Sequence, residues 1–285
     1  MSDEATEPTH KPVEHFRLDY KPNPYTVPNL DLNFELDESD TIVHGVLHLN
    51  KAFEVSEGTK DIVLDGEELE LLELILNETK LSADQYSVAD DQLTISAAVI
   101  DSIVSADKKN FQLSIKVKVH PDKNTALSGL YKSADLLCTQ CEAMGFRRII
   151  YYFDRPDVLT VYSVRLEGDK TRHPVLLSNG NRISAGDISG TNRHWALWQD
   201  PFPKPCYLFA LVAGDLASIH DTYKTTSGRV VQLGIYAEKE NKDQLDHAMY
   251  SLKASMKWDE DTFGLECDLD VYNVVSTNFF NMGAM

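Results

Sequence analysis

The feature that most constrains this chain is a period-two alternation of apolar and polar residues. It runs almost without a break through residues 111–120, and it recurs in residues 30–37 and 41–50. Successive side chains of an extended strand point to opposite faces, so such a segment buries one face and leaves the other in water. These segments therefore predict half-buried antiparallel strands.

Shorter apolar segments extend the same pattern over roughly the first 215 residues. The pairs Asp65-Gly66 and Asn179-Gly180 predict tight turns, because these residue types tolerate positive φ, and we expect the first pair to close a hairpin. Many short strands with almost no helical periodicity predict a mainly β fold, a sandwich or saddle. The further strands are expected at residues 69–76, 92–95, 149–153, 160–166, 174–177, 194–198 and 207–212.

The pattern changes after residue 215. Leu245, Met249, Leu252 and Met256 follow one another at spacings of four, three and four, which predicts an amphipathic helix over residues 243–259. Expected strands at 230–237 and 269–275 flank this helix, so we expect a second domain of mixed α and β class. The predicted organisation is a flexible arm (1–20), a β-rich domain (21–215) and the beginning of a further domain (216–285).

Composition excludes several classes of partner. The formal net charge of −18 opposes binding to nucleic acid or to an anionic membrane. No apolar stretch approaches the roughly 18 to 20 residues that span a bilayer, and the polar opening segment lacks the core of a signal peptide. Four irregularly spaced cysteines suit reduced thiols. We therefore expect a cytoplasmic protein without a nucleic-acid or membrane partner.

The segment 138–156 carries the most informative polar residues. If residues 138–142 are extended, Gln140 and Glu142 project from one face and Cys141 from the other. A carboxylate beside an amide oxygen suits a free ammonium group, since one supplies charge and the other accepts an N–H. The same spacing fits an ordinary surface glutamate beside an ordinary glutamine. The residues alone leave both interpretations open.

Other chemistry has little support. His44 and His48 are four residues apart, but in a strand that separation is about 13 Å, too far for one metal ion. The pair Cys138-x-x-Cys141 has no second pair to complete a zinc ribbon. Neither a phosphate-binding glycine loop nor a G-x-S-x-G elbow is present. We therefore expect no catalytic residue and no metal ligand within this sequence.

Several strings, in the right order, resemble the aminopeptidase N family of zinc aminopeptidases, and the bacterial-type enzyme most closely. Residues 140–148 (QCEAMGFRR) resemble the segment that presents a Gln and a Glu to the substrate's α-amino group. Residues 154–157 (DRPD) follow at the family's spacing, and residues 200–214 resemble the end of its N-terminal domain. Residues 281–285 (NMGAM) match the start of its G-A-M-E-N exopeptidase motif. The resemblance covers the chain from about residue 18 to its last residue.

The resemblance implies roles for individual residues. Glu142 is expected to anchor the ammonium group of the substrate, with help from Gln140. The resemblance also implies that Met282 and Asn281 line the pocket for the substrate's first side chain. Backbone groups of Gly283 and Ala284 are expected to align the peptide beside the metal. The expected substrate-binding residues are Gln140, Glu142, Asn281, Met282, Gly283 and Ala284.

The family binds zinc through H-E-x-x-H on a helix and a further Glu, and this sequence contains no such string. The resemblance therefore implies that residues 216–285 are the truncated start of an α+β, thermolysin-like catalytic domain, with the zinc ligands further along a longer chain. That longer enzyme would release single N-terminal residues from peptides with a free N-terminus, while this sequence alone is expected to be inactive.

Two other functions stay open. One is a free-standing, non-catalytic β-sandwich module that captures amines or peptide termini. The other is an interaction domain in which the same residues only pack.

Overall fold

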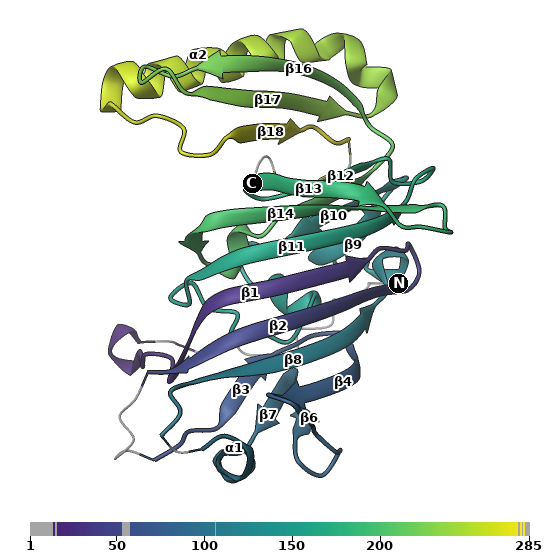
Figure 1. Cartoon of the computed structure of the whole chain (residues 1–285). Helices are drawn as coiled ribbons and strands as arrows, with labels where there is room; N and C mark the ends of the chain where they lie inside the picture. Colours follow the sequence, from purple (N-terminus) through teal and green to yellow (C-terminus); the bar gives the residue numbers. More distant parts are fainter. Residues whose placement is uncertain are drawn as a thin grey trace, which may run out of the picture.

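Strands dominate the fold, which confirms the predicted mainly β class. Figure 1 shows a large twisted sheet through the middle of the molecule, with smaller sheets packed around it and the long helix α2 at one end. Among the described residues, no helix is both long and apolar enough to cross a membrane. The computed structural model describes residues 14, 16–52, 58–105, 107–278, 280 and 282.

The large sheet has eight strands in the order β13-β14-β11-β1-β2-β8-β4-β5. Strands β1 and β11 run parallel, and the other neighbouring pairs are antiparallel. The strands span Tyr25–Glu35 (β1), Thr41–Lys51 (β2), Glu70–Leu76 (β4), Thr79–Lys80 (β5), Asn110–Val119 (β8), Thr160–Asp169 (β11), Asn181–Asp187 (β13) and Arg193–Lys204 (β14).

A four-stranded sheet, in the order β12-β15-β10-β9, shares the main hydrophobic core with the large sheet. Alternate residues of β1, such as Leu30, Leu32 and Phe34, are at most 2% exposed and belong to the same apolar cluster as Leu137 and Leu211. The sandwich predicted from alternation is therefore present. The four strands span Gly129–Ser133 (β9), Leu136–Gln140 (β10), Val175–Ser178 (β12) and Leu211–Gly214 (β15).

A small sheet, β3-β7-β6, and the short helix α1 complete this part of the molecule. Helix α1 was not predicted from the sequence, because its seven residues, of which Val99, Ile100 and Ile103 pack against the core, are too few to show a helical period. Ser96 caps its first turn by accepting a hydrogen bond from the backbone N–H of Val99. The elements span Ile62–Asp65 (β3), Ser87–Ala89 (β6), Gln92–Ile95 (β7) and Ala97–Ile103 (α1).

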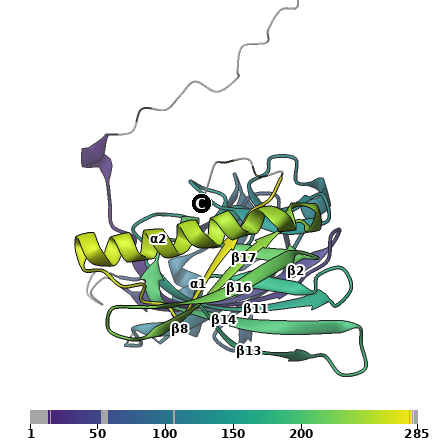
Figure 2. The same cartoon turned by 90° about the horizontal axis from the view of Figure 1, so that it is seen from above.

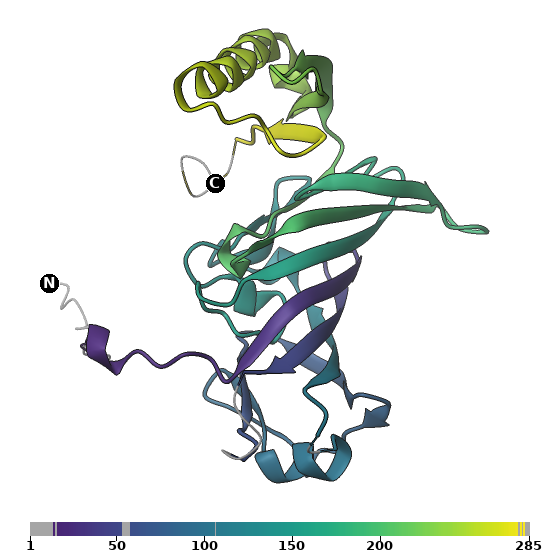
Figure 3. The ribbon, with the colours of Figure 1, turned by 60° about the vertical axis from the view of Figure 1, so that its left-hand side comes forward.

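The chain changes sheet between Gly214 and Ala217. It then forms a three-stranded sheet, β16-β17-β18, on which α2 lies (Figure 2). Figure 3 shows this unit beyond the β13 end of the large sheet. The three-part division of the chain stays a prediction. The elements span Ala217–Lys224 (β16), Val230–Ala237 (β17), Leu245–Phe263 (α2) and Val271–Val275 (β18).

Helix α2 confirms the predicted amphipathic helix. Leu245, Met249 and Met256 are buried and pack against the apolar side chains of β17. Gly264 ends the helix in the left-handed conformation, with φ of 66°, and its N–H bonds to the carbonyl of Glu260. This ending is favoured at glycine, which has no side chain to clash there.

Three predictions of local structure are wrong. The strand expected at residues 207–212 is instead a 3₁₀ turn at Cys206–Leu208, and β15 begins only at Leu211. Residues 149–153 form no strand; they follow a 3₁₀ turn at Phe146–Arg148, and only Tyr152 makes an isolated bridge, to Asp65. All five side chains are at most 3% exposed, so this apolar run fills the core as irregular backbone. The Asp65-Gly66 turn closes no hairpin, because β3 pairs with β7 rather than with β4.

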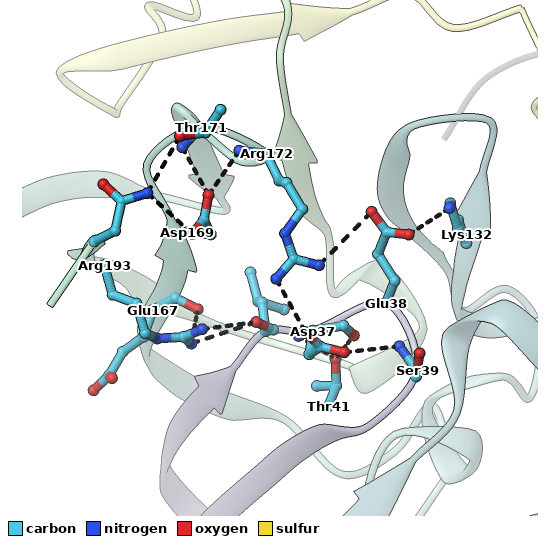
Figure 4. Close-up of polar contacts among 12 residues, drawn as sticks. Asp37, Glu38, Ser39, Thr41, Lys132, Glu167, Asp169, Thr171, Arg172 and Arg193 are labelled. Carbon is cyan, nitrogen blue, oxygen red and sulfur yellow. Dashed lines mark hydrogen bonds and ion pairs between the residues drawn. The ribbon is translucent and has the colours of Figure 1, made fainter.

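Charged side chains fasten the two main sheets together at one end (Figure 4). Arg172 Nη2 lies 3.1 Å from Asp37 Oδ2, in the turn after β1. Lys132 of β9 pairs with Glu38 in the same turn. The backbone N–H of Ser39, and then the Arg172 guanidinium, lower the pKa of Asp37. This network connects the first turn of the large sheet to the edge strand of the four-stranded sheet.

His173 lies beside this network and is fully buried. Neither of its ring nitrogens has a hydrogen-bond partner among the described residues. Burial, and then the positive charge of Arg172, lower the pKa of His173, while Glu38, Asp169 and Asp37 oppose that shift. The native state therefore holds this imidazole neutral at a pH where an unfolded chain protonates it.

This difference predicts a pH-dependent stability. Because the folded-state pKa lies below the ordinary value of 6.5, unfolding takes up a proton at and below that pH, and the free energy of unfolding falls as pH decreases from about 7 to 5. We expect His173→Leu to flatten this profile, measured by urea unfolding at each pH. The control His247→Leu, at an exposed position of α2, should leave the slope unchanged. Parallel profiles for His173→Leu and the parent would contradict the prediction.

Candidate functional site

The candidate site is built on a tight turn that follows β10. The strand ends at Gln140, and residues 142–145 turn back so that the N–H of Gly145 donates to the carbonyl of Cys141 at 2.8 Å. The peptide bond between Glu142 and Ala143 is cis. A Cβ on Gly145 would lie 2.6 Å from the Gln140 carbonyl oxygen. Only glycine permits the turn to approach β10 this closely.

Gln140 and Glu142 do not share one face of an extended strand, since the strand ends before Glu142. Gln140 is 2% exposed, whereas Glu142 is exposed on the turn. The turn itself brings the two residues together: Gln140 Nε2 donates to the backbone carbonyl of Glu142 at 3.2 Å. The site therefore combines a buried amide with an exposed carboxylate.

The end of the described chain returns to β10. Met282 Sδ lies 2.7 Å from Gln140 Nε2, although the two residues are 142 positions apart in the sequence. Phe280 packs against an apolar cluster that contains Leu136 and Cys138 of the same strand. The structure thus places Met282 beside Gln140. The other three predicted residues of this segment, Asn281, Gly283 and Ala284, lie outside the described residues.

One atom of Gln140 is left without a partner. Its Oε1 is buried and accepts no hydrogen bond from any described residue. Buried polar atoms in folded proteins are nearly always hydrogen-bonded. An unpaired acceptor at this position is therefore suited to an N–H donor supplied by a ligand.

A hollow of about 400 Å³ opens beside Glu142. Two of the charged groups on its wall pair with each other: Arg155 donates to both carboxylate oxygens of Asp157, at 2.9 and 2.7 Å. Tyr20 also donates to Asp157, at 2.9 Å. The carboxylate of Glu142 has no ion pair or side-chain hydrogen bond among the described residues. It is thus the lining carboxylate left to meet a cation.

A buried ion pair holds the turn in place. Arg147 Nε donates to Asp154 Oδ2 at 2.8 Å, and the backbone N–H of Arg147 donates to the same oxygen at 3.2 Å. The Asp154 side chain is 1% exposed, and its other oxygen accepts from the Cys206 thiol at 3.1 Å. Burial, followed by the charge of Asp154, raises the pKa of Cys206 far above its usual range, so this thiol stays protonated as a donor.

Comparison with known proteins shows the family of this chain. Residues 20–208 match the family profile of the Peptidase M1 N-terminal domain. The chain is 46% identical to Aminopeptidase N of Escherichia coli (strain K12) over 279 residues, which is 97% of this chain and 30% of that protein. This chain belongs to the aminopeptidase N family. It is also 44% identical over 270 residues to Aminopeptidase N of Haemophilus influenzae, with 95% and 30% of the two chains covered.

A solved aminopeptidase structure shares the fold. It is described as Legionella pneumophila aminopeptidase A in complex with aspartic acid, and it aligns with a TM-score of 0.84 at 32% identity. The alignment covers 93% of this chain and 30% of that one. The chain therefore spans about a third of the length of the aminopeptidases it matches.

The described residues contain no ligand set for the zinc ion that the family resemblance implies. Among the described residues, no three His, Cys, Asp or Glu side chains are grouped as a metal site. His48 pairs with Asp31 at 2.8 Å and His44 with Ser114 at 2.8 Å, both across the outer face of the large sheet. The residues that the structure describes do not fit a zinc ion.

The pair Cys138-x-x-Cys141 is part of the core. The two thiols belong to apolar clusters on opposite sides of the four-stranded sheet. Burial raises the pKa of Cys138 to about 11, and it raises that of Cys141 still further. Thiolates bind metals and exchange disulfides, so protonated, buried thiols have a packing role in this member of the aminopeptidase N family.

Sequence reasoning did not assign roles to the ion pair behind the turn or to the wall of the hollow. Arg147 and Asp154 belong to sequence segments that indicate the family but not a contact between the two residues. Their burial was the missing information, because an acidic and a basic residue seven positions apart give no signal of contact.

The ion pair generates a stability prediction. Arg147→Met removes the cation and leaves the Asp154 carboxylate buried, which costs about 3 to 5 kcal/mol of the free energy of unfolding. Urea denaturation measures this loss. The matched control is Arg182→Met, at an exposed arginine of β13, which should change stability by less than about 0.5 kcal/mol. A similar small effect for both variants would show that Asp154 does not depend on Arg147.

Proposed function

We propose that this chain recognises the α-ammonium group of a peptide's N-terminal residue, as part of an aminopeptidase that releases such residues singly. One observation carries the proposal: Gln140 Oε1, buried and without a hydrogen-bond partner among the described residues, lies next to a turn that exposes the carboxylate of Glu142. The relatives that match nearly the whole chain are named aminopeptidases, which supports the same reaction class.

The chemistry of an ammonium group matches these two residues. A protonated amine has three N–H donors and one positive charge. The carboxylate of Glu142 would compensate the charge, and the amide oxygen of Gln140 would accept another donor. A chain with a net charge of −18 also attracts cations in general.

The same arrangement supports exopeptidase action. A carboxylate that neutralises one ammonium group favours a peptide whose N-terminal residue lies beside it. Cleavage at an internal peptide bond would require the preceding residues of the substrate to occupy the space that this carboxylate fills. Met282, beside Gln140, is proposed to line the pocket for the first side chain together with Asn281. Backbone groups of Gly283 and Ala284 are proposed to align the peptide.

Zinc enters this proposal only through a longer enzyme that contains the chain. There it would supply an activated water for hydrolysis, held by ligands outside these residues. A cytoplasmic location is also part of the proposal, and the four free cysteines support it.

The ammonium site is tested by binding rather than by turnover. Leucinamide, titrated into the chain and followed by NMR, should bind, and N-acetyl-leucinamide, which lacks the charge, should not. Glu142→Gln should weaken leucinamide binding about tenfold or more, because a hydrogen bond to a charged group is worth roughly 1.5 to 3 kcal/mol.

Two variants control this experiment. Glu78→Gln makes the same change at an exposed glutamate between β4 and β5, and it should leave the affinity unchanged. Gln140→Leu removes the unpaired amide oxygen and should also weaken binding. Equal affinities for leucinamide in Glu142→Gln and Glu78→Gln would remove Glu142 from the site.

Hydrolysis gives a second test. The 285-residue chain should release no reporter from an alanyl or leucyl substrate, even with added zinc, since its described residues hold no zinc ligand set. Chelator-sensitive turnover by the purified chain would contradict this and would point to a metal site among its residues.

A further inference from the structure

A second polar hollow lies on the outer face of the large sheet. It has a volume of about 490 Å³ and sits across β1, β2 and β8, which are adjacent in Figure 1. The buried neighbours of its lining residues, such as Leu30 and Leu113, point into the core that the two sheets share. The hollow therefore opens on the side of the large sheet that faces away from Gln140.

An irregularity in β1 marks the position of this hollow. The pairing of β1 with β2 shifts register between Thr26 and Asn29. Pro28 lies in the shifted segment and has no N–H to offer to the ladder. Its ring forms part of the wall.

The lining is a row of neutral polar side chains. Cross-strand pairing aligns Asn29 with His48 and His48 with Gln112, and the next pair of β2 and β8 on the same face is Asn50 with Asn110. Carboxamides therefore face the hollow from three neighbouring strands, and Asn77, after β4, adds another.

A hydrogen-bonded chain orients one end of this row. His48 Nε2 lies 2.8 Å from Asp31 Oδ2, and His48 Nδ1 lies 3.4 Å from Gln112 Nε2. With Gln112 as donor to Nδ1, the imidazole donates its Nε2–H to the carboxylate. This leaves the Gln112 amide oxygen facing away from His48, as an acceptor fixed in direction.

The other carboxamides have unused hydrogen-bonding capacity. The side chains of Asn29, Asn50 and Asn110 make no hydrogen bond with any described residue. Asn77 uses only its oxygen, which accepts from the backbone N–H of Gln112 at 3.0 Å. Each free carboxamide offers two donors and one acceptor in a hollow without a formal charge of its own, apart from the imidazole.

We propose that this hollow binds a neutral, polyhydroxylated small molecule of the mono- or disaccharide class. A sugar hydroxyl both donates and accepts, as a carboxamide does, and its C–H face can pack on the ring of Pro28. The volume lies within the usual range of small-molecule sites, about 300 to 1,000 Å³.

Competing ligand classes fit this lining less well. An anion is disfavoured because the net charge of −18 repels it and the lining contains no lysine or arginine. A cation finds no carboxylate in the lining, and Asp31, beside the lining residue His48, is already bonded to it. An extended peptide would find only short unpaired stretches to add to, because β1 pairs with β11 from Asn29 onward and β8 pairs with β4 from Leu113 onward.

The proposal does not depend on aminopeptidase action. Saturation-transfer difference NMR tests it with glucose, methyl α-D-glucopyranoside and maltose as neutral probes and glucose 6-phosphate as the charged counterpart. The neutral sugars should show saturable, millimolar binding. A free sugar and the end of a glycan share this chemistry, and the methyl glycoside, with its blocked anomeric oxygen, represents the glycan.

Substitutions locate the binding. Asn29→Ala and Asn50→Ala should each weaken binding about fivefold, the effect of one lost hydrogen bond, without loss of thermal stability. Asn33→Ala is the matched control. Asn33 lies on the outer face of β1, about 13 Å along the strand from Asn29, and it bonds to Arg165. Absence of saturation transfer, equal binding by all three variants, or tighter binding of glucose 6-phosphate would overturn the proposal.

Discussion

The candidate site depends on the burial of one carboxylate, that of Asp154. An unpaired charge at this depth would be strongly destabilising, and the pairing with Arg147 is what permits it. Because the backbone N–H of Arg147 also donates to Asp154, the ion pair fixes the main chain directly after the turn as well as a side chain. The exposed carboxylate of Glu142 is thereby held on a rigid base, with Gly145, the last residue of the turn, packed against β10.

The same sandwich presents two polar surfaces of different chemistry. Around Glu142 the charges are arranged so that the other lining carboxylates are paired and one remains available. On the outer face of the large sheet, neutral carboxamides line a hollow beside the irregular segment of β1 at Pro28. The second surface uses the shared core as a support: buried residues alternate with the lining ones along β1, β2 and β8, so packing sets the direction of the exposed side chains.

Wherever burial follows the period of the element, the sequence predicted the structure well. The alternation in β2 and β8, and the stripe of α2 from Leu245 to Met256, correspond to observed elements whose apolar side chains enter a core. The prediction was wrong at residues 149–153, where every side chain is buried and the period is lost. It was also wrong at Asp65-Gly66, because a tight turn can lead into a different sheet as readily as into a hairpin.

By itself the sequence determined the β-rich class, the helix α2 and the family, since each is written in residues close together along the chain. Only the tertiary structure decided that Gln140 is buried, with an oxygen that no described residue bonds, that Met282 lies beside it, and that Glu142 stands on a turn rather than a strand. These facts depend on contacts between segments far apart in the sequence and on which side chains lose water. Periodicity records the direction of a side chain along one element, whereas its partner across the fold is set by packing.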